Sequence, residues 1–86
     1  MTRYTVSWRP EIKADLAEIW LSATDKGAVT AAADQIDELL SRDADCRGVD
    51  VHEGLRALVV EPLVIHFTAS KPDRLTTVWS VRRTDA

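Results

Sequence analysis

The sequence predicts an α+β fold in which an N-terminal helical hairpin packs on one face of a small, mainly antiparallel sheet. Residues 55–60, 63–69 and 75–82 are rich in β-branched, aliphatic and aromatic side chains, with turn residues between them. Residues 10–23 and 26–42 repeat apolar side chains at helical spacing. An alternating stretch precedes them, so the expected element order is β-α-α-β-β-β, with helices on one side of the sheet only.

The alternating stretch, residues 4–8, predicts the first strand, and Pro10 suits the first turn of the helix that follows. Thr24 and Asp25 break the helical pattern, and either side chain can cap the second helix. The many alanines of that helix predict a close approach to the first. Residues 43–54 are polar and rich in turn residues, which predicts a long loop.

Composition and charge narrow the class of protein. The 86 residues make one domain, residues 1–86, with a single cysteine, Cys46, as expected in a reducing cytosol. No secretory leader and no membrane span are expected, so we predict a cytoplasmic protein. The net charge is −3, so binding to nucleic acid through bulk charge alone is excluded. We expect no cofactor, and two separated histidines without a carboxylate array do not predict a metal site.

Alternation along the strands predicts which side chains share a face of the sheet. We assign to the core face the side chains of Leu55, Ala57, Val59, Leu63, Ile65, Phe67, Ala69, Leu75, Thr77, Trp79 and Val81. The outer face then carries Arg56, Leu58, Val60, Val64, His66, Thr68, Thr76, Val78, Ser80 and Arg82. All three tryptophans, Trp8, Trp20 and Trp79, fall on core positions.

Cross-strand partners share a face, so Arg56 should lie opposite His66, and Ala57 opposite Ile65. A plain two-residue turn at Glu61 and Pro62 would give the other parity, which predicts a wider loop or a bulge there.

The outer face, with a basic centre and an aliphatic surround, predicts a surface for a partner. Arg56 either pairs with phosphate and stabilises developing negative charge, or makes an ordinary surface ion pair. His66 is either a general acid or base, or a half-buried strand histidine without a task. Arg82 completes this candidate catalytic set. Candidate contacts to a partner protein are Leu58, Val60, Val64, Val78 and Arg83.

Four stretches carry a resemblance to a known family: YTVSWRPEIKADLAEIWLSATD, AVTAAADQIDELL, GLRALVVEPLVIHF and LTTVWSVRR. Their order and spacing, over nearly the whole chain, resemble the RelE/ParE superfamily. These are toxins of bacterial type II toxin–antitoxin systems, often called plasmid stabilisation proteins. The resemblance implies a growth-inhibiting toxin that a small antitoxin wraps with a helix or strand, in a hetero-oligomer.

The resemblance leaves the cellular target open. RelE-like members cleave mRNA in the ribosomal A site with Lys and Arg side chains and often a C-terminal Tyr or His, whereas ParE-like members inhibit DNA gyrase. Arg56 matches the arginine of the family's second strand, and Arg82 and Arg83 match basic residues at the end of its last strand. The chain lacks the lysine-rich stretch before the second strand and the terminal Tyr or His. The alternatives are an RNA endonuclease using Arg56, Arg82 and His66, a gyrase poison, and a degenerate member that only binds a partner.

Overall fold

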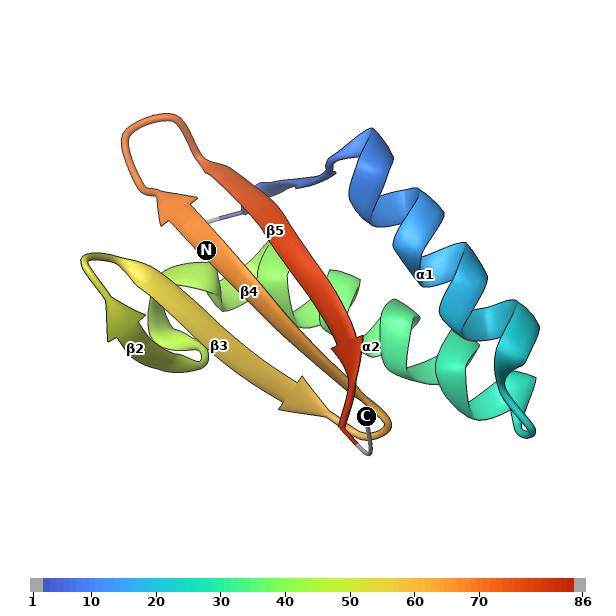
Figure 1. The fold of residues 1–86 in the computed structure, drawn as a ribbon. Coiled ribbons are helices and arrows are strands. Elements are labelled where there is room, and N and C mark those ends of the chain that lie inside the picture. The colour runs from blue at the N-terminus through green and yellow to red at the C-terminus, as the bar shows by residue number, and fades with distance from the viewer. Residues whose placement is uncertain (1–2, 85–86) are drawn as a thin grey trace.

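The computed structural model describes residues 3–84, which form two helices, a short 3-10 turn and a five-stranded sheet (Figure 1). In chain order the elements are β1 (Thr5–Trp8), α1 (Pro10–Ser22), α2 (Lys26–Asp43), η1 (Ala44–Cys46), β2 (Val49–His52), β3 (Leu55–Val60), β4 (Leu63–Ser70) and β5 (Leu75–Arg83). The strand order in the sheet is β1-β5-β4-β3-β2. Among the strands of residues 3–84 only β1 and β5 pair in parallel, which confirms the predicted mainly antiparallel α+β fold.

One strand was not predicted. The expected loop at residues 43–54 instead contains η1 and β2, and β2 pairs antiparallel with β3 along the edge of the sheet. Gly48 and Gly54 bracket β2 with φ angles of +76° and +88°, in the left-handed region that favours glycine. The same turn residues that predicted a loop therefore allow a four-residue strand between two bends.

Both helices begin as the sequence predicts. Pro10 occupies the first turn of α1, and the Glu11 carboxylate accepts a hydrogen bond from Arg9 Nε. Hydrogen bonding to the backbone N–H and to Arg9 lowers the pKa of Glu11. Of the two candidate caps for α2, the structure uses Asp25, whose carboxylate accepts a hydrogen bond from the Ala28 N–H at 3.0 Å. An N-cap of this kind stabilises a helix by about 0.5–2 kcal/mol.

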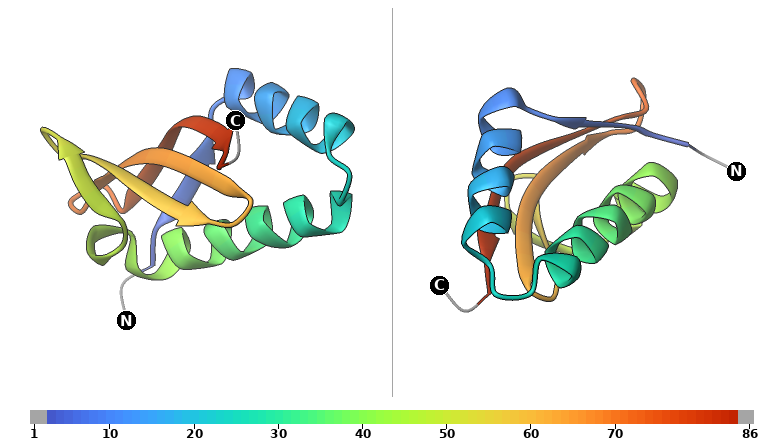
Figure 2. Two further views of the ribbon diagram at one scale, coloured as in Figure 1. Left: turned by 60° about the horizontal axis from the view of Figure 1, so that its bottom comes forward. Right: turned by 90° about the vertical axis from the view of Figure 1, so that its right-hand side faces the viewer.

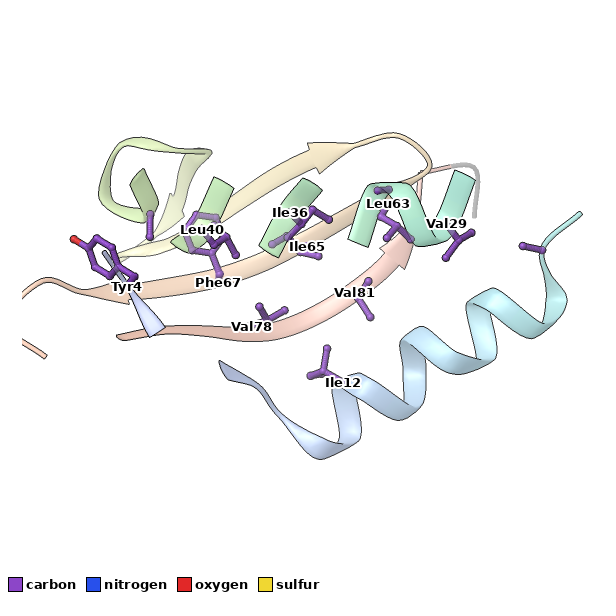
Figure 3. Packing of buried hydrophobic residues seen from close by; sticks show 13 residues of the cluster. Tyr4, Ile12, Val29, Ile36, Leu40, Leu63, Ile65, Phe67, Val78 and Val81 are labelled. Carbon is purple, nitrogen blue, oxygen red and sulfur yellow. The ribbon is translucent and has the colours of Figure 1, made fainter. Parts of the chain in front are cut away.

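The core lies between α2 and the sheet. The buried side chains of α2 are Val29, Ala32, Ile36 and Leu40. They pack against the fully buried Leu63, Ile65 and Phe67 of β4 (Figure 3). We therefore define the core face of the sheet as the face toward α2 and the outer face as the opposite one.

The helical hairpin is splayed rather than closely packed (Figure 2). α1 makes most of its contacts with β5, and Ile12 is its one side chain in the buried core. Trp20 is 39% exposed and donates a hydrogen bond from Nε1 to Thr30 Oγ1 at 3.2 Å, so its predicted core position is wrong. Trp8 is partly buried against the core, as predicted. Among residues 3–84, neither helix is long and apolar enough to cross a bilayer.

A bulge in β5 changes which of its side chains face the core. His66 pairs with Ser80, but the next residue of β4, Phe67, pairs with Val78, so Trp79 is an extra residue. Before the bulge, Thr76 and Val78 are fully buried, and Leu75, Thr77 and Trp79 belong to the outer face. The predicted faces of these five residues are therefore wrong. The predicted faces of Ser80, Val81 and Arg82, after the bulge, are confirmed.

The predicted faces of β3 are inverted along the whole strand. Val60 pairs directly with Leu63 across the two-residue turn, which places Leu58 opposite Ile65 and Arg56 opposite Phe67. Arg56, Leu58 and Val60 therefore belong to the core face. Leu55, Ala57 and Val59 belong to the outer face, and Val59 is 56% exposed. The expected bulge or wider loop at Glu61 and Pro62 is absent, so the parity of the plain turn decides the register.

Tyr4, the single tyrosine, gives the fold a dependence on alkaline pH. Burial and the negative charge of Asp45 raise the pKa of its hydroxyl above the ordinary value. The unfolded chain then loses this proton at a lower pH than the native chain, so the free energy of unfolding should fall as pH rises above about 10. The contribution is fully present below that pH. Tyr4→Phe should show a smaller fall, measured by urea unfolding at a series of pH values, and equal falls would contradict the assignment.

Candidate functional site

The outer face of the sheet carries the candidate site, since α2 covers only the core face and no helix or strand of residues 3–84 lies over the front of β2, β3, β4 and β5 (Figure 1). Its side chains on β3, β4 and β5 are Leu55, Ala57, Val59, Val64, His66, Thr68, Ser70, Leu75, Thr77, Trp79, Ser80 and Arg82. None of these twelve is a carboxylate, although the whole chain has a net charge of −3. The face is thus mildly basic in an acidic protein.

His66 and Ser80 form the centre of the face. They are direct cross-strand partners, and His66 Nδ1 lies 2.8 Å from Ser80 Oγ. This hydrogen bond fixes the orientation of the imidazole, whatever tautomer it carries. Arg82 is exposed and lies opposite Val64, the next outward pair along the same two strands. The structure therefore brings His66 and Arg82 onto one face, as the sequence predicted.

Trp79 and Arg9 form a second cluster on this face. The bulge turns Trp79 outward, and its Nε1 donates a hydrogen bond to Thr68 Oγ1 at 2.9 Å. The guanidinium carbon of Arg9 lies 4.6 Å from the centroid of the Trp79 ring, within the range of a cation–π contact. Trp79 is nevertheless 45% exposed. It is therefore a large aromatic side chain that neighbours hold in place while much of its surface faces solvent.

Arg56 does not join this site. It lies on the core face, at the end of β3 next to β2, and its Nε donates a hydrogen bond to the Arg47 carbonyl oxygen at 2.8 Å. The predicted pairing of Arg56 with His66 is wrong, because His66 lies opposite Ala57. The contact with Arg47 ties β3 to the segment that follows η1. The catalytic roles assigned to Arg56, His66 and Arg82 stay predictions.

That contact leads to a test of stability. Arg56→Ala removes a hydrogen bond from a charged donor to a half-buried carbonyl, and should lower the free energy of unfolding by about 1.5–3 kcal/mol. Arg82→Ala is the matched control, because Arg82 is exposed on the outer face and its loss should change stability by less than about 0.5 kcal/mol. Chemical unfolding of the two variants measures the difference. Equal stabilities would mean that the Arg56 contact is unimportant to the fold.

The residues predicted to contact a partner protein do not share one face of the sheet. Val64 lies on the outer face, as expected. Leu58 and Val60 pack partly buried against the core, and Val78 is fully buried, so the outer positions predicted for these three are wrong. Arg83 pairs with Leu63 and so lies on the core face, where it borders a hollow of about 300 Å³ with Asp25, Pro62 and other residues. Arg82 and Arg83 thus point to opposite faces.

Sequence reasoning missed Arg9, Val59 and Trp79 as members of the outer face. Two signals were available. Val78 and Val81 are both apolar but three residues apart, so strict alternation places them on opposite faces, whereas a bulge between them places both on the same face. The turn at Glu61 and Pro62 is short enough to fix the parity of β3 by itself. Within residues 3–84, no cluster of three His, Cys, Asp or Glu side chains has the geometry to hold a metal ion.

Comparison with known proteins places the fold. No protein-family model and no curated protein sequence matches this chain. The structure is similar to a chain of the toxin–antitoxin complex RelBE2 from Mycobacterium tuberculosis, with a TM-score of 0.78 and 15% sequence identity. The likeness covers 96% of this chain and 93% of that chain. The protein therefore has the RelE-like α+β fold, which confirms the architecture that the resemblance to the RelE/ParE superfamily implied.

Proposed function

We propose that this protein is the toxin of a bacterial type II toxin–antitoxin pair, acting in the cytoplasm and neutralised by a small antitoxin with which it forms a hetero-oligomer. The observation that carries the proposal is the likeness to a chain of a toxin–antitoxin complex over 96% of this chain, with a TM-score of 0.78. The exposed valines and tryptophan on the sheet support it, because exposed apolar side chains gathered on one face are typical of a protein-binding surface.

For the target, the geometry favours a protein such as DNA gyrase over cleavage of mRNA. Cleavage through the predicted set needs Arg56 and His66 to act on the same phosphate. The two residues lie on opposite faces of the sheet, and Arg56 is hydrogen-bonded to the Arg47 carbonyl. Poisoning a protein target needs no such assembly.

RNA cleavage is the second candidate, because one observation favours it. His66, held by Ser80, shares the uncovered face with Arg82, so a histidine able to move a proton and an arginine able to stabilise a phosphate lie on the same surface. A site of this kind would use His66 and Arg82 without Arg56.

Expression of the chain alone in bacteria tests the proposal and separates the targets. We expect growth arrest, trapped DNA breaks and intact mRNA ends. Two variants serve as controls. Arg56→Ala should still arrest growth, provided that the variant folds. Leu58→Asp should not fold stably and should therefore abolish growth arrest. Cuts in mRNA that His66→Gln removes would establish the endonuclease instead. Normal growth with a folded chain would refute toxicity and favour a degenerate member that only binds its partner.

A further inference from the structure

The outer face divides into two regions of different chemistry. The aliphatic region lies on β2, β3 and β4, where Val49 pairs with Ala57 and Val59 pairs with Val64. Val49 is 72% exposed and Val59 is 56% exposed, so these side chains present apolar surface to solvent. The basic region lies on β4, β5 and the end of β1. It contains His66, Arg82 and the stacked Arg9 and Trp79.

The charges around the basic region set the kind of ligand it favours. The carboxylates bordering it come from α1, where Glu11 pairs with Arg9, and where Asp15 and Glu18 line a hollow of about 410 Å³ together with Arg82. Across β3 and β4, on the way to the valines, the outer face carries no negative charge. A ligand that crosses the face from β5 to β2 therefore meets cations first and aliphatic side chains second.

We propose that this face docks a segment of the antitoxin that carries carboxylates at one end and aliphatic side chains at the other. The carboxylates of the segment pair with Arg82 and with the rest of the basic region around His66. Its aliphatic side chains bury Val49 and Val59. The identity of the partner rests on the proposed function, but the recognition chemistry does not. Trp79 and Arg9 supply the residue types that dominate binding energy at protein interfaces.

A protein segment fits this face better than a nucleic acid does. Affinity for nucleic acid comes mainly from several phosphate contacts, and Arg9, Arg82 and His66 offer few, with Arg9 already paired to Glu11. The exposed valines give a phosphodiester backbone nothing to contact, whereas aliphatic side chains of a peptide remove them from water. Single-stranded nucleic acid is therefore the competing outcome that the experiment must report.

Selection from a random peptide library against the folded full chain tests the proposal, and it works whichever antitoxin the chain pairs with. We expect selected peptides enriched in Asp and Glu next to Val, Leu or Ile. Their affinity should fall about tenfold or more in Val59→Lys and in Arg82→Glu, because each change opposes one region of the face. Leu21→Lys is the matched control, since Leu21 is 67% exposed and belongs to α1 rather than to the sheet, and it should leave affinity unchanged.

Three results would overturn the inference. Peptides without acidic enrichment would contradict the charge argument. Peptides that Leu21→Lys weakens and Val59→Lys does not would place the binding surface on the helices. A single-stranded oligonucleotide that binds the chain and loses affinity in Arg82→Glu, while no peptide is selected, would make the face a nucleic-acid surface. Growth arrest is measured separately, so acidic peptides bound to a non-toxic chain would refute the toxin proposal while keeping the docking surface.

Discussion

Leu58→Asp should prevent stable folding, whereas Val59→Asp, one residue further along β3, should leave the fold intact. Leu58 lies opposite the fully buried Ile65 and packs against the core, while Val59 is 56% exposed on the outer face. Replacing a core leucine costs about 2–5 kcal/mol from lost packing alone, and an unpaired carboxylate at the same position adds to that cost. A domain of this size has only about 5–10 kcal/mol of stability in total, so the first variant loses most of it.

Circular dichroism and urea unfolding of the two variants measure the difference directly. Leu58→Ala serves as a milder change at the same site, and should lower the unfolding free energy by about 2–3 kcal/mol while remaining folded. Val59→Asp should stay within about 0.5 kcal/mol of the parent chain. If Val59→Asp unfolds the protein and Leu58→Asp does not, β3 has the opposite register, and Arg56 returns to the outer face beside His66.

Sequence reasoning succeeded for β4 and for the two helices. In β4 the apolar side chains alternate with more polar ones, so Leu63, Ile65 and Phe67 identified the core face, and all three are fully buried. The helices were equally clear, because Pro10 and Asp25 mark where they begin and the buried residues of α2 recur at helical spacing. Each of these elements has a single pattern of apolar side chains, and only one face can bury it.

β3 could not be assigned from its own pattern. Leu58 and Val60 on one face are as apolar as Leu55 and Val59 on the other, so alternation does not choose between them. The choice belongs to the turn that joins β3 to β4, and a shift of one residue moves every side chain to the other face. The short edge strand β2 was missed for a related reason, since four residues between two glycines read as a loop.

The candidate site was predicted only in part because it depends on these ambiguous strands. The outer positions of His66, Val64 and Arg82 were predicted correctly, because the faces of β4 and of the end of β5 were assigned correctly. The outer position predicted for Arg56 was wrong because the predicted register of β3 was wrong. Trp79 was placed in the core because bulky aromatic side chains are usually buried and because a bulge leaves only a weak trace in one sequence. Surfaces built on bulged strands are therefore the hardest part of a small sheet to infer.

Gly48→Ala should destabilise the protein strongly, because two separate requirements meet at this glycine. Its φ angle is +76°, where a residue with a Cβ is strained by about 1–2 kcal/mol. A Cβ at this position would also lie 2.6 Å from the Ala57 carbonyl oxygen and 3.2 Å from Phe67 Cε1. The first contact is with backbone and the second with a fully buried ring, so neither neighbour moves without disturbing β3 or the core. We expect a total loss of about 2–4 kcal/mol.

Gly54→Ala separates the two causes. Gly54 has a similar φ angle of +88°, but within residues 3–84 no atom beyond its two chain neighbours lies within 4 Å of a Cβ built there. Its substitution should therefore cost only the backbone strain, about 1–2 kcal/mol, measured by the same urea unfolding. The excess cost at Gly48 then reports the close approach that holds β2 against β3. Equal losses at the two glycines would show that β2 can move away from the sheet at little cost, and Val49 would then lie outside the fixed part of the outer face.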